Sequence, residues 1–273
     1  MKKMLPVQEL ARDSRFWRTR MEEQMSDPRI GAGRVRGTYQ RPGRFNPDEP
    51  QAADGARSLM HGIFMGEIQA LEAAGRTAFD FDLDQTPFQL KLDMARQCWD
   101  EARHVEISVK LTEWMGTDIG EFAEATFLYE AACNADPAMR LTGVNRALEG
   151  LAIDVFNTMK DFGERSGDPV MTFCEDWMLA DEVTHVKMGS DWLRRLTEND
   201  PERRKQALDF QRLVDKIFSL GGQRSDHEDA PIKLARQFRS IAGFSSEEIE
   251  EIADVSNEAA AESLARMGAP TKA

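Results

Sequence analysis

The sequence is poor in residues that cross-link or interrupt a fold. It has 3 cysteines, 11 prolines and 2 tyrosines among 273 residues. Cys98, Cys133 and Cys174 are far apart and form no Cys-x-x-Cys pair, which argues against a zinc site and favours reduced thiols. No apolar run approaches the roughly 20 residues that span a membrane, and the start MKKMLPVQEL lacks the apolar core of a signal peptide. We therefore expect a cytoplasmic protein without a membrane partner.

Positive charge is also scarce. The chain has 35 Lys and Arg against 48 Asp and Glu, a net charge of -13, which argues against general nucleic-acid binding. The exception is the turn-rich arm between Pro28 and Pro50, where five arginines occur without an intervening acid. The arm suits a polyanion, but we favour contact with the acidic body or a sister subunit. The arginines are Arg29, Arg34, Arg36, Arg41 and Arg44.

Helical periodicity, in contrast, is abundant. Ala, Leu, Met, Glu and Arg dominate, and no segment alternates like a strand, so we expect an all-α fold. A shorter helical piece, Phe122 to Cys133, lies in the connection between the second and third long runs. We expect four tryptophans in the core: Trp99, Trp114, Trp177 and Trp192. The long helical runs are predicted at 53–77, 87–116, 138–164 and 168–197.

These runs divide the chain into three parts. Residues 1–52 are expected to form an N-terminal helix and the arginine-rich arm. Residues 53–197 are expected to form a four-helix bundle with a long crossover. Residues 198–273 are expected to form a C-terminal helical extension packed on the bundle. This extension includes a helix near 201–220 and one that follows the capping-box pattern Ser245-x-x-Glu248.

One motif occurs twice. The second run contains Asp100-Glu101-Ala102-Arg103-His104-Val105, and the fourth contains Asp181-Glu182-Val183-Thr184-His185-Val186. Positions i and i+3 of a helix share a face, so each glutamate and histidine aim at one point. This carboxylate and imidazole set suits a first-row transition metal. The other two of the chain's 4 histidines, His61 and His227, are expected to be ordinary residues.

A candidate lone glutamate precedes each motif by one helix. Glu67 and Glu149 lie 34 and 33 residues before the motif glutamates, so the chain looks like two related helical hairpins. Glu72 and Asp154 are alternatives five residues further on, about 140° around the helix. Spacing does not choose between the pairs. Inside a bundle, four carboxylates and two imidazoles would surround two metal ions, because four buried charges are prohibitive without metal.

The pattern resembles that of the ferritin-like di-iron carboxylate superfamily, which has Glu, Glu-x-x-His, Glu, Glu-x-x-His over matching helices. Within it, the chain looks most like an uncharacterised ferritin-like branch with flanking extensions. The resemblance favours Glu67 and Glu149 over the alternatives. It also implies that Asp100 and Asp181 orient the ligand histidines and increase their basicity. The implied ligands are Glu67, Glu101, His104, Glu149, Glu182 and His185.

The resemblance implies a function. We expect an O2-dependent di-iron oxidase or monooxygenase with two iron ions as cofactor and O2 as co-substrate, although di-manganese or mixed Mn/Fe use the same ligands. Its partners would be a small organic substrate, an external electron donor and a second copy of the chain in a homodimer. The alternative is a ferroxidase, iron-handling or peroxide-scavenging protein; a vestigial helical module is a third. The expected pocket residues are Phe64, Met94, Cys98, Ile153 and Met178.

Overall fold

The computed structural model describes residues 53–117, 119–122, 127–219, 222–227 and 230–268. The expected N-terminal helix and arginine-rich arm lie outside these ranges. The described part is all-α, as predicted, apart from two strands of two residues each. No helix in these ranges is both long enough and apolar enough to cross a membrane.

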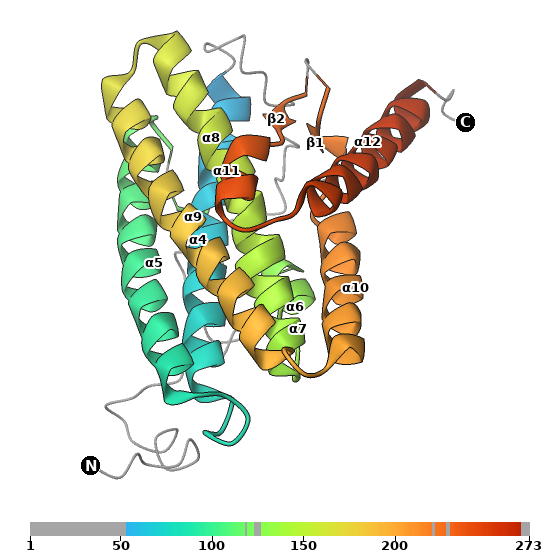
Figure 1. The fold of residues 1–273 in the computed structure, drawn as a ribbon. Coiled ribbons are helices and arrows are strands. Elements are labelled where there is room, and N and C mark those ends of the chain that lie inside the picture. Colours follow the sequence, from blue (N-terminus) through green and yellow to red (C-terminus); the bar gives the residue numbers. More distant parts are fainter. Residues whose placement is uncertain (1–52, 118, 123–126, 220–221, 228–229, 269–273) are drawn as a thin grey trace.

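Four long helices lie side by side in two hairpins (Figure 1). The first two pack along one another, the last two do the same, and α5 also contacts α9. Their short connections make each hairpin antiparallel. The four helices are α4 (Ala53–Phe79), α5 (Phe88–Trp114), α8 (Glu149–Ser166) and α9 (Pro169–Leu196).

Local chemistry accounts for the turn between α8 and α9. Gly167 ends α8 with a φ of 69°, a left-handed conformation that favours glycine. The next residue, Asp168, caps α9 by accepting bonds from the backbone N–H groups of Val170 and Met171. Pro169 occupies the first helical position, as predicted from the sequence. Together these residues fix the turn that returns the chain along the bundle.

The expected single helix at 138–164 is three elements. A helix, α7 (Pro137–Leu141), leads into a π-helix, η1 (Thr142–Leu148), and α8 begins at Glu149. Apolar periodicity does not separate a π-helix from an α-helix, so the sequence missed this change. Within η1, a Cβ on Gly143 would lie 2.1 Å from the Ala132 carbonyl oxygen. Glycine therefore lets η1 approach the end of α6 (Phe127–Ala132), the helix in the crossover.

The C-terminal part packs against the bundle through α7, η1, α8 and α9. One of its helices, α11, and its two parallel strands were not predicted from the sequence. The capping box at the start of its last helix is confirmed, since the Ser245 N–H donates to Glu248 and the Glu248 N–H donates to Ser245. The elements are α10 (Pro201–Ile217), β1 (Arg224–Ser225), β2 (Ile232–Lys233), α11 (Arg236–Ile241) and α12 (Ser246–Gly268).

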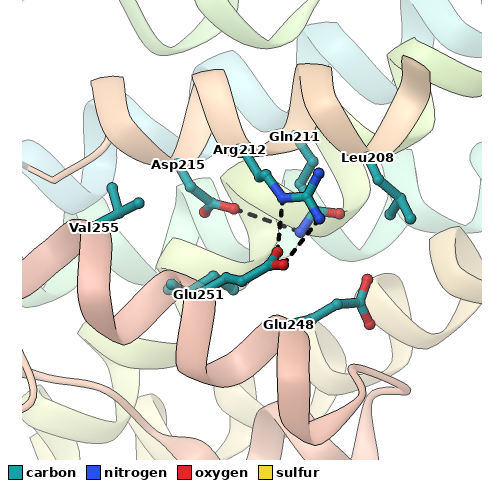
Figure 2. A pocket seen from close by; sticks show the side chains of 8 residues that line it. Leu208, Gln211, Arg212, Asp215, Glu248, Glu251 and Val255 are labelled. Atoms are coloured by element: carbon teal, nitrogen blue, oxygen red, sulfur yellow. Dashed lines mark hydrogen bonds and ion pairs between the residues drawn. The ribbon is translucent and has the colours of Figure 1, made fainter. Parts of the chain in front are cut away.

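Figure 2 shows where α10 meets α12. Arg212 on α10 donates two hydrogen bonds, of 2.7 and 3.0 Å, to the carboxylate of Glu251 on α12. The pocket beside this pair has a volume of about 20 Å³. That is room for one water molecule, so we assign no ligand to it.

The prediction that four tryptophans are core residues is wrong for two of them. Trp192 is 4% exposed and Trp177 is half-buried, whereas Trp99 and Trp114 are 67% and 61% exposed. Trp99 lies two positions before Glu101, about 200° around α5, and therefore points away from the bundle interior. Trp114 lies at the end of α5, where its indole N–H donates to Asp168.

Candidate metal centre

All six expected ligand side chains lie in the interior of the four-helix assembly. Each side chain comes from one of the long helices, and none belongs to a residue more than 4% exposed. Helix α4 contributes one residue, α8 contributes its first residue, and α5 and α9 contribute two each. These residues are Glu67, Glu101, His104, Glu149, Glu182 and His185.

The ligand atoms form two overlapping groups. Within each group, one atom from every residue lies within 4.8 Å of the others. Glu101 and Glu182 belong to both groups, so their carboxylates lie between the two positions. One group consists of Glu67, Glu101, His104 and Glu182, and the other of Glu101, Glu149, Glu182 and His185.

Each shared carboxylate offers one oxygen to each histidine. His104 Nδ1 lies 3.2 Å from Glu101 Oε2 and 3.0 Å from Glu182 Oε1. His185 Nδ1 lies 3.1 Å from Glu101 Oε1 and 3.5 Å from Glu182 Oε2. Atoms bound to one first-row metal ion at about 2.1 Å lie about 3–4 Å apart. The arrangement therefore has the spacing of two ion positions joined by two glutamates.

The unsatisfied polar atoms test whether the cluster fits a metal. Glu101 Oε2, both carboxylate oxygens of Glu182 and His185 Nδ1 are buried, and the contacts of 3.0–3.5 Å between them and the facing groups do not make hydrogen bonds among the described residues. Buried polar atoms without partners are costly, and native proteins pair nearly all of them. Lone pairs from carboxylates and an imidazole that converge in this way are metal-ligand chemistry. The buried cluster can therefore hold metal.

Without metal, the cluster must hold protons. Burial raises the pKa of Glu67 to about 8 and raises that of Glu149 well above its usual range. Burial by itself lowers the pKa of His185, but the charges of Glu101 and Glu182 outweigh it and the net shift is upward. Protons on these groups partly neutralise the four carboxylates. Metal binding must displace these protons.

The two motifs are linked crosswise through their aspartates. His104 Nε2 lies 3.3 Å from Asp181 Oδ2, and His185 Nε2 lies 3.3 Å from Asp100 Oδ2. Each histidine thus uses the aspartate of the other motif and turns Nδ1 toward the glutamates. Carboxylates in this position fix the tautomer and orientation of a ligand histidine. Arg103 donates to Asp100 and, at 3.3 Å, to Asp181, so it joins the two motifs.

Two amide side chains near the cluster were missed by the sequence reasoning. Gln97 donates to Glu101 Oε1 at 3.0 Å and to Glu149 Oε1 at 2.7 Å. Asn145 of the π-helix donates to Gln97 Oε1 at 2.6 Å, which fixes the amide orientation. Gln97 precedes Glu101 by four residues, so a polar residue on the ligand face was the available clue.

A further buried acid was also missed. Glu175 on α9 is fully buried, and neither carboxylate oxygen has a hydrogen-bond partner among the described residues. Burial raises its pKa well above the usual range, and the nearby charge of Glu67 adds to the shift. Glu175 precedes Glu182 by seven residues, two helical turns, so it lies on the same face of α9. That spacing was the clue in the sequence.

The alternatives to the lone glutamates lie elsewhere. Asp154 accepts bonds of 3.0 and 2.6 Å from the guanidinium of Arg239, and both side chains are completely buried. Glu72 is half-buried and belongs to neither ligand group. The structure thus places Glu67 and Glu149, and not these two residues, beside the motif ligands.

A cavity of about 190 Å³ lies beside the cluster, between α4 and α8. Glu67 and Glu149 form part of its wall, together with small and aliphatic residues. None of the five expected pocket residues lines it. Met94 packs in a separate cluster with Trp192, while Ile153, Met178 and Phe64 are buried in the core, and Cys98 is half-buried beside Leu71. The pocket residues were predicted from their spacing to a ligand along a helix. That spacing does not show on which side of the ligands the cavity lies.

The comparisons with known proteins give one match. A family model described as "Protein of unknown function (DUF455)" matches residues 1–250. No curated protein and no solved structure matches significantly. The family match includes the whole ligand cluster and more than half of the chain. The chain therefore belongs to the DUF455 family.

Proposed function

We propose that this protein is a ferritin-like, non-haem di-iron oxidase or monooxygenase that uses O2 and a small organic substrate. The observation that carries the proposal is the pair of overlapping ligand groups, with two shared glutamates and one histidine each. The cavity that reaches Glu67 and Glu149 supports a substrate, because it offers space next to the cluster.

The six ligand residues would divide between the two ions. Glu101 and Glu182 would hold both ions, with Glu67 and His104 on one and Glu149 and His185 on the other. Two ferrous ions in such a carboxylate site supply the electrons that reduce O2. Buried carboxylates suit this chemistry because their negative charge favours higher metal oxidation states. The apolar cavity wall would hold the substrate against the cluster.

The reaction must balance. As a monooxygenase, the protein would place one oxygen atom of O2 in the substrate and release the other as water. This needs two electrons and two protons for each turnover in addition to the two electrons from the substrate. A reduced flavin or iron–sulfur protein is the class of donor that supplies them.

Iron handling by a ferroxidase is the competing proposal, and one experiment tests its iron-storage form. Anaerobic protein is loaded with Fe(II) and exposed to O2, while oxygen consumption, the iron-to-protein ratio and particle size are followed. About two irons per chain in a small particle that consumes O2 supports an oxygenase. Iron in large excess over protein in a large shell would contradict it and favour storage.

A further inference from the structure

The cavity beside the cluster has an apolar wall. It lies between α4 and α8, with Leu128 of α6 on one side. Apart from Glu67 and Glu149, its described lining contains only glycine, alanine, aliphatic residues and Phe156. No lysine, arginine, hydroxyl or amide side chain is among them. An anionic ligand would therefore lose its hydration without gaining a donor, which is unfavourable.

Two glycines of α4 keep this space open. A Cβ at Gly62 would meet no atom within 4 Å, and one at Gly66 would meet only Leu128 Cδ1, at 3.9 Å. Other glycines serve close packing, since a Cβ at Gly189 would lie 2.3 Å from the Asn145 Cβ. Glycine is less favourable than alanine in a helix interior. Gly62 and Gly66 gain no close packing in return: Gly62 is exposed where the cavity opens to solvent, and Gly66 is half-buried beside Leu128.

We propose that the cavity binds a neutral, apolar group about the size of a single aromatic ring, and that Gly62 and Gly66 set this size. Its volume is about 190 Å³, and a dry protein cavity of about 150 Å³ is enough to bind benzene. The ring would lie along α4 and α8 with one edge toward Glu67 and Glu149. Turnover of such a compound rests on the proposed function, but its binding does not.

The test uses two probes of similar size on the full-length, metal-free chain: fluorobenzene and 4-fluorobenzoate. Fluorine NMR measures their binding. We expect fluorobenzene to bind at least tenfold more tightly than the anion. In Gly62→Leu, the leucine side chain fills the cavity, so fluorobenzene affinity should fall at least tenfold. Gly75→Ala is the matched control, because Gly75 is on the same helix outside the cavity lining.

Three results would overturn the inference: tighter binding of 4-fluorobenzoate, unchanged fluorobenzene affinity in Gly62→Leu, or no fluorobenzene binding by the full chain. Circular dichroism and zinc-to-protein ratios of Gly62→Leu show that the fold and cluster are intact; Gly66→Leu serves if Gly62→Leu fails to fold. Selective fluorobenzene binding that Gly62→Leu abolishes supports the inference even if iron-loaded protein consumes no O2. In that case only the proposed function fails.

Discussion

At the residue scale, the shared and unshared glutamates differ in what their loss removes. Glu101 and Glu182 belong to both ligand groups, whereas Glu67 and Glu149 belong to one each. A shared carboxylate has one oxygen facing each histidine, so its removal opens both positions. The removal of an unshared carboxylate leaves the other position with its own histidine and both bridges.

This difference predicts metal stoichiometry. Glu101→Ala and Glu182→Ala should each lower bound iron from about two ions per chain to well below one. Glu67→Ala and Glu149→Ala should each retain about one. Elemental analysis after anaerobic loading measures the ratio. Glu106→Ala, at an exposed position on α5, is the control and should retain both ions. Unchanged stoichiometry in both shared-glutamate variants would place the metal elsewhere.

Glu175 gives a second prediction at this scale. Burial raises its pKa, so the folded protein keeps its proton at a pH where the unfolded chain, with a value of 4.5, has lost it. The contribution of Glu175 to the stability of the metal-free protein must therefore fall as pH rises above about 4.5. Glu175→Gln removes this contribution and should be more stable than wild type at pH 8 by about 1 kcal/mol or more.

Urea unfolding as a function of pH measures the effect. Glu113→Gln, at an exposed position on α5, is the matched control and should reproduce the wild-type pH dependence. A Glu175→Gln curve that runs parallel to wild type at all pH values would show that Glu175 is not held neutral.

At the scale of elements, the π-helix η1 places two site residues at once. It ends immediately before Glu149 and contains Asn145, the partner of Gln97. π-helical turns are rare and often occur at functional sites, because they change which side chains face inward. Gly189 on α9 lies one turn after His185 and leaves the space that the Asn145 side chain occupies.

Gly189→Ala should therefore disturb the cluster without touching a ligand. The added Cβ would lie 2.3 Å from the Asn145 Cβ, so η1 or α9 must shift. We expect a loss of about 1–3 kcal/mol in stability and about tenfold weaker metal binding. Competition with a metal-sensitive dye measures the affinity. Gly62→Ala, where the Cβ meets nothing within 4 Å, is the control; equal metal affinities in the two variants would contradict the prediction.

The link between α11 and α8 is a buried ion pair. Arg239 donates to both oxygens of Asp154 and to the Gly150 carbonyl oxygen, and neither Arg239 nor Asp154 is exposed. Without Arg239, the buried Asp154 carboxylate would keep only the longer ion pair, of 3.7 Å, to Arg224. Arg239→Gln should therefore lower the free energy of unfolding by about 3 kcal/mol, the lower end of the range for breaking a buried pair.

The exposed pair in Figure 2 supplies the comparison. Arg212 bonds to Glu251 with similar geometry but lies at the surface, so Arg212→Gln should cost less than about 1 kcal/mol. Chemical denaturation of both variants measures the difference. Equal costs would show that burial is not what makes the Arg239 pair important.

The sequence predicted the long helices and the ligand residues, but not how the two motifs contact each other. Apolar periodicity located the long helices, and the repeat of the Glu101 and Glu182 motifs found side chains that the structure brings together. It did not find the crosswise use of Asp100 and Asp181, because the offset between two helices is set by packing and not by spacing along either one. The side on which the cavity opens, marked by Gly62, depends on the same packing.

At the scale of the whole molecule, metal binding and protonation are coupled. In the metal-free protein, burial raises the pKa of Glu67 to about 8, and the pKa of His185 is raised by Glu101 and Glu182. At lower pH an incoming ion must displace these protons. Metal affinity should therefore increase as pH rises from about 6 to about 9, with protons released on binding.

Titration calorimetry of zinc binding in buffers with different ionisation enthalpies counts the protons released. We expect at least one proton per chain at pH 7, and fewer above pH 8 as Glu67 loses its proton before the metal arrives. Equal affinity at all pH values would mean that the metal-free cluster holds no protons.

The two overlapping ligand groups give one chain the approximate symmetry of a two-fold dimer, and that symmetry is broken next to the ligands. Four residues before the shared glutamates stand Gln97 on α5 and Met178 on α9. Four residues before the unshared glutamates stand Asn145 and Ile63. Gln97 donates to Glu149 and Asn145 donates to Gln97, so both amides lie on the side of Glu149, and the residues at the equivalent positions for Glu67 are a thioether and an alkyl group. The two ions would therefore occupy unequal environments, fill in sequence and differ in redox potential.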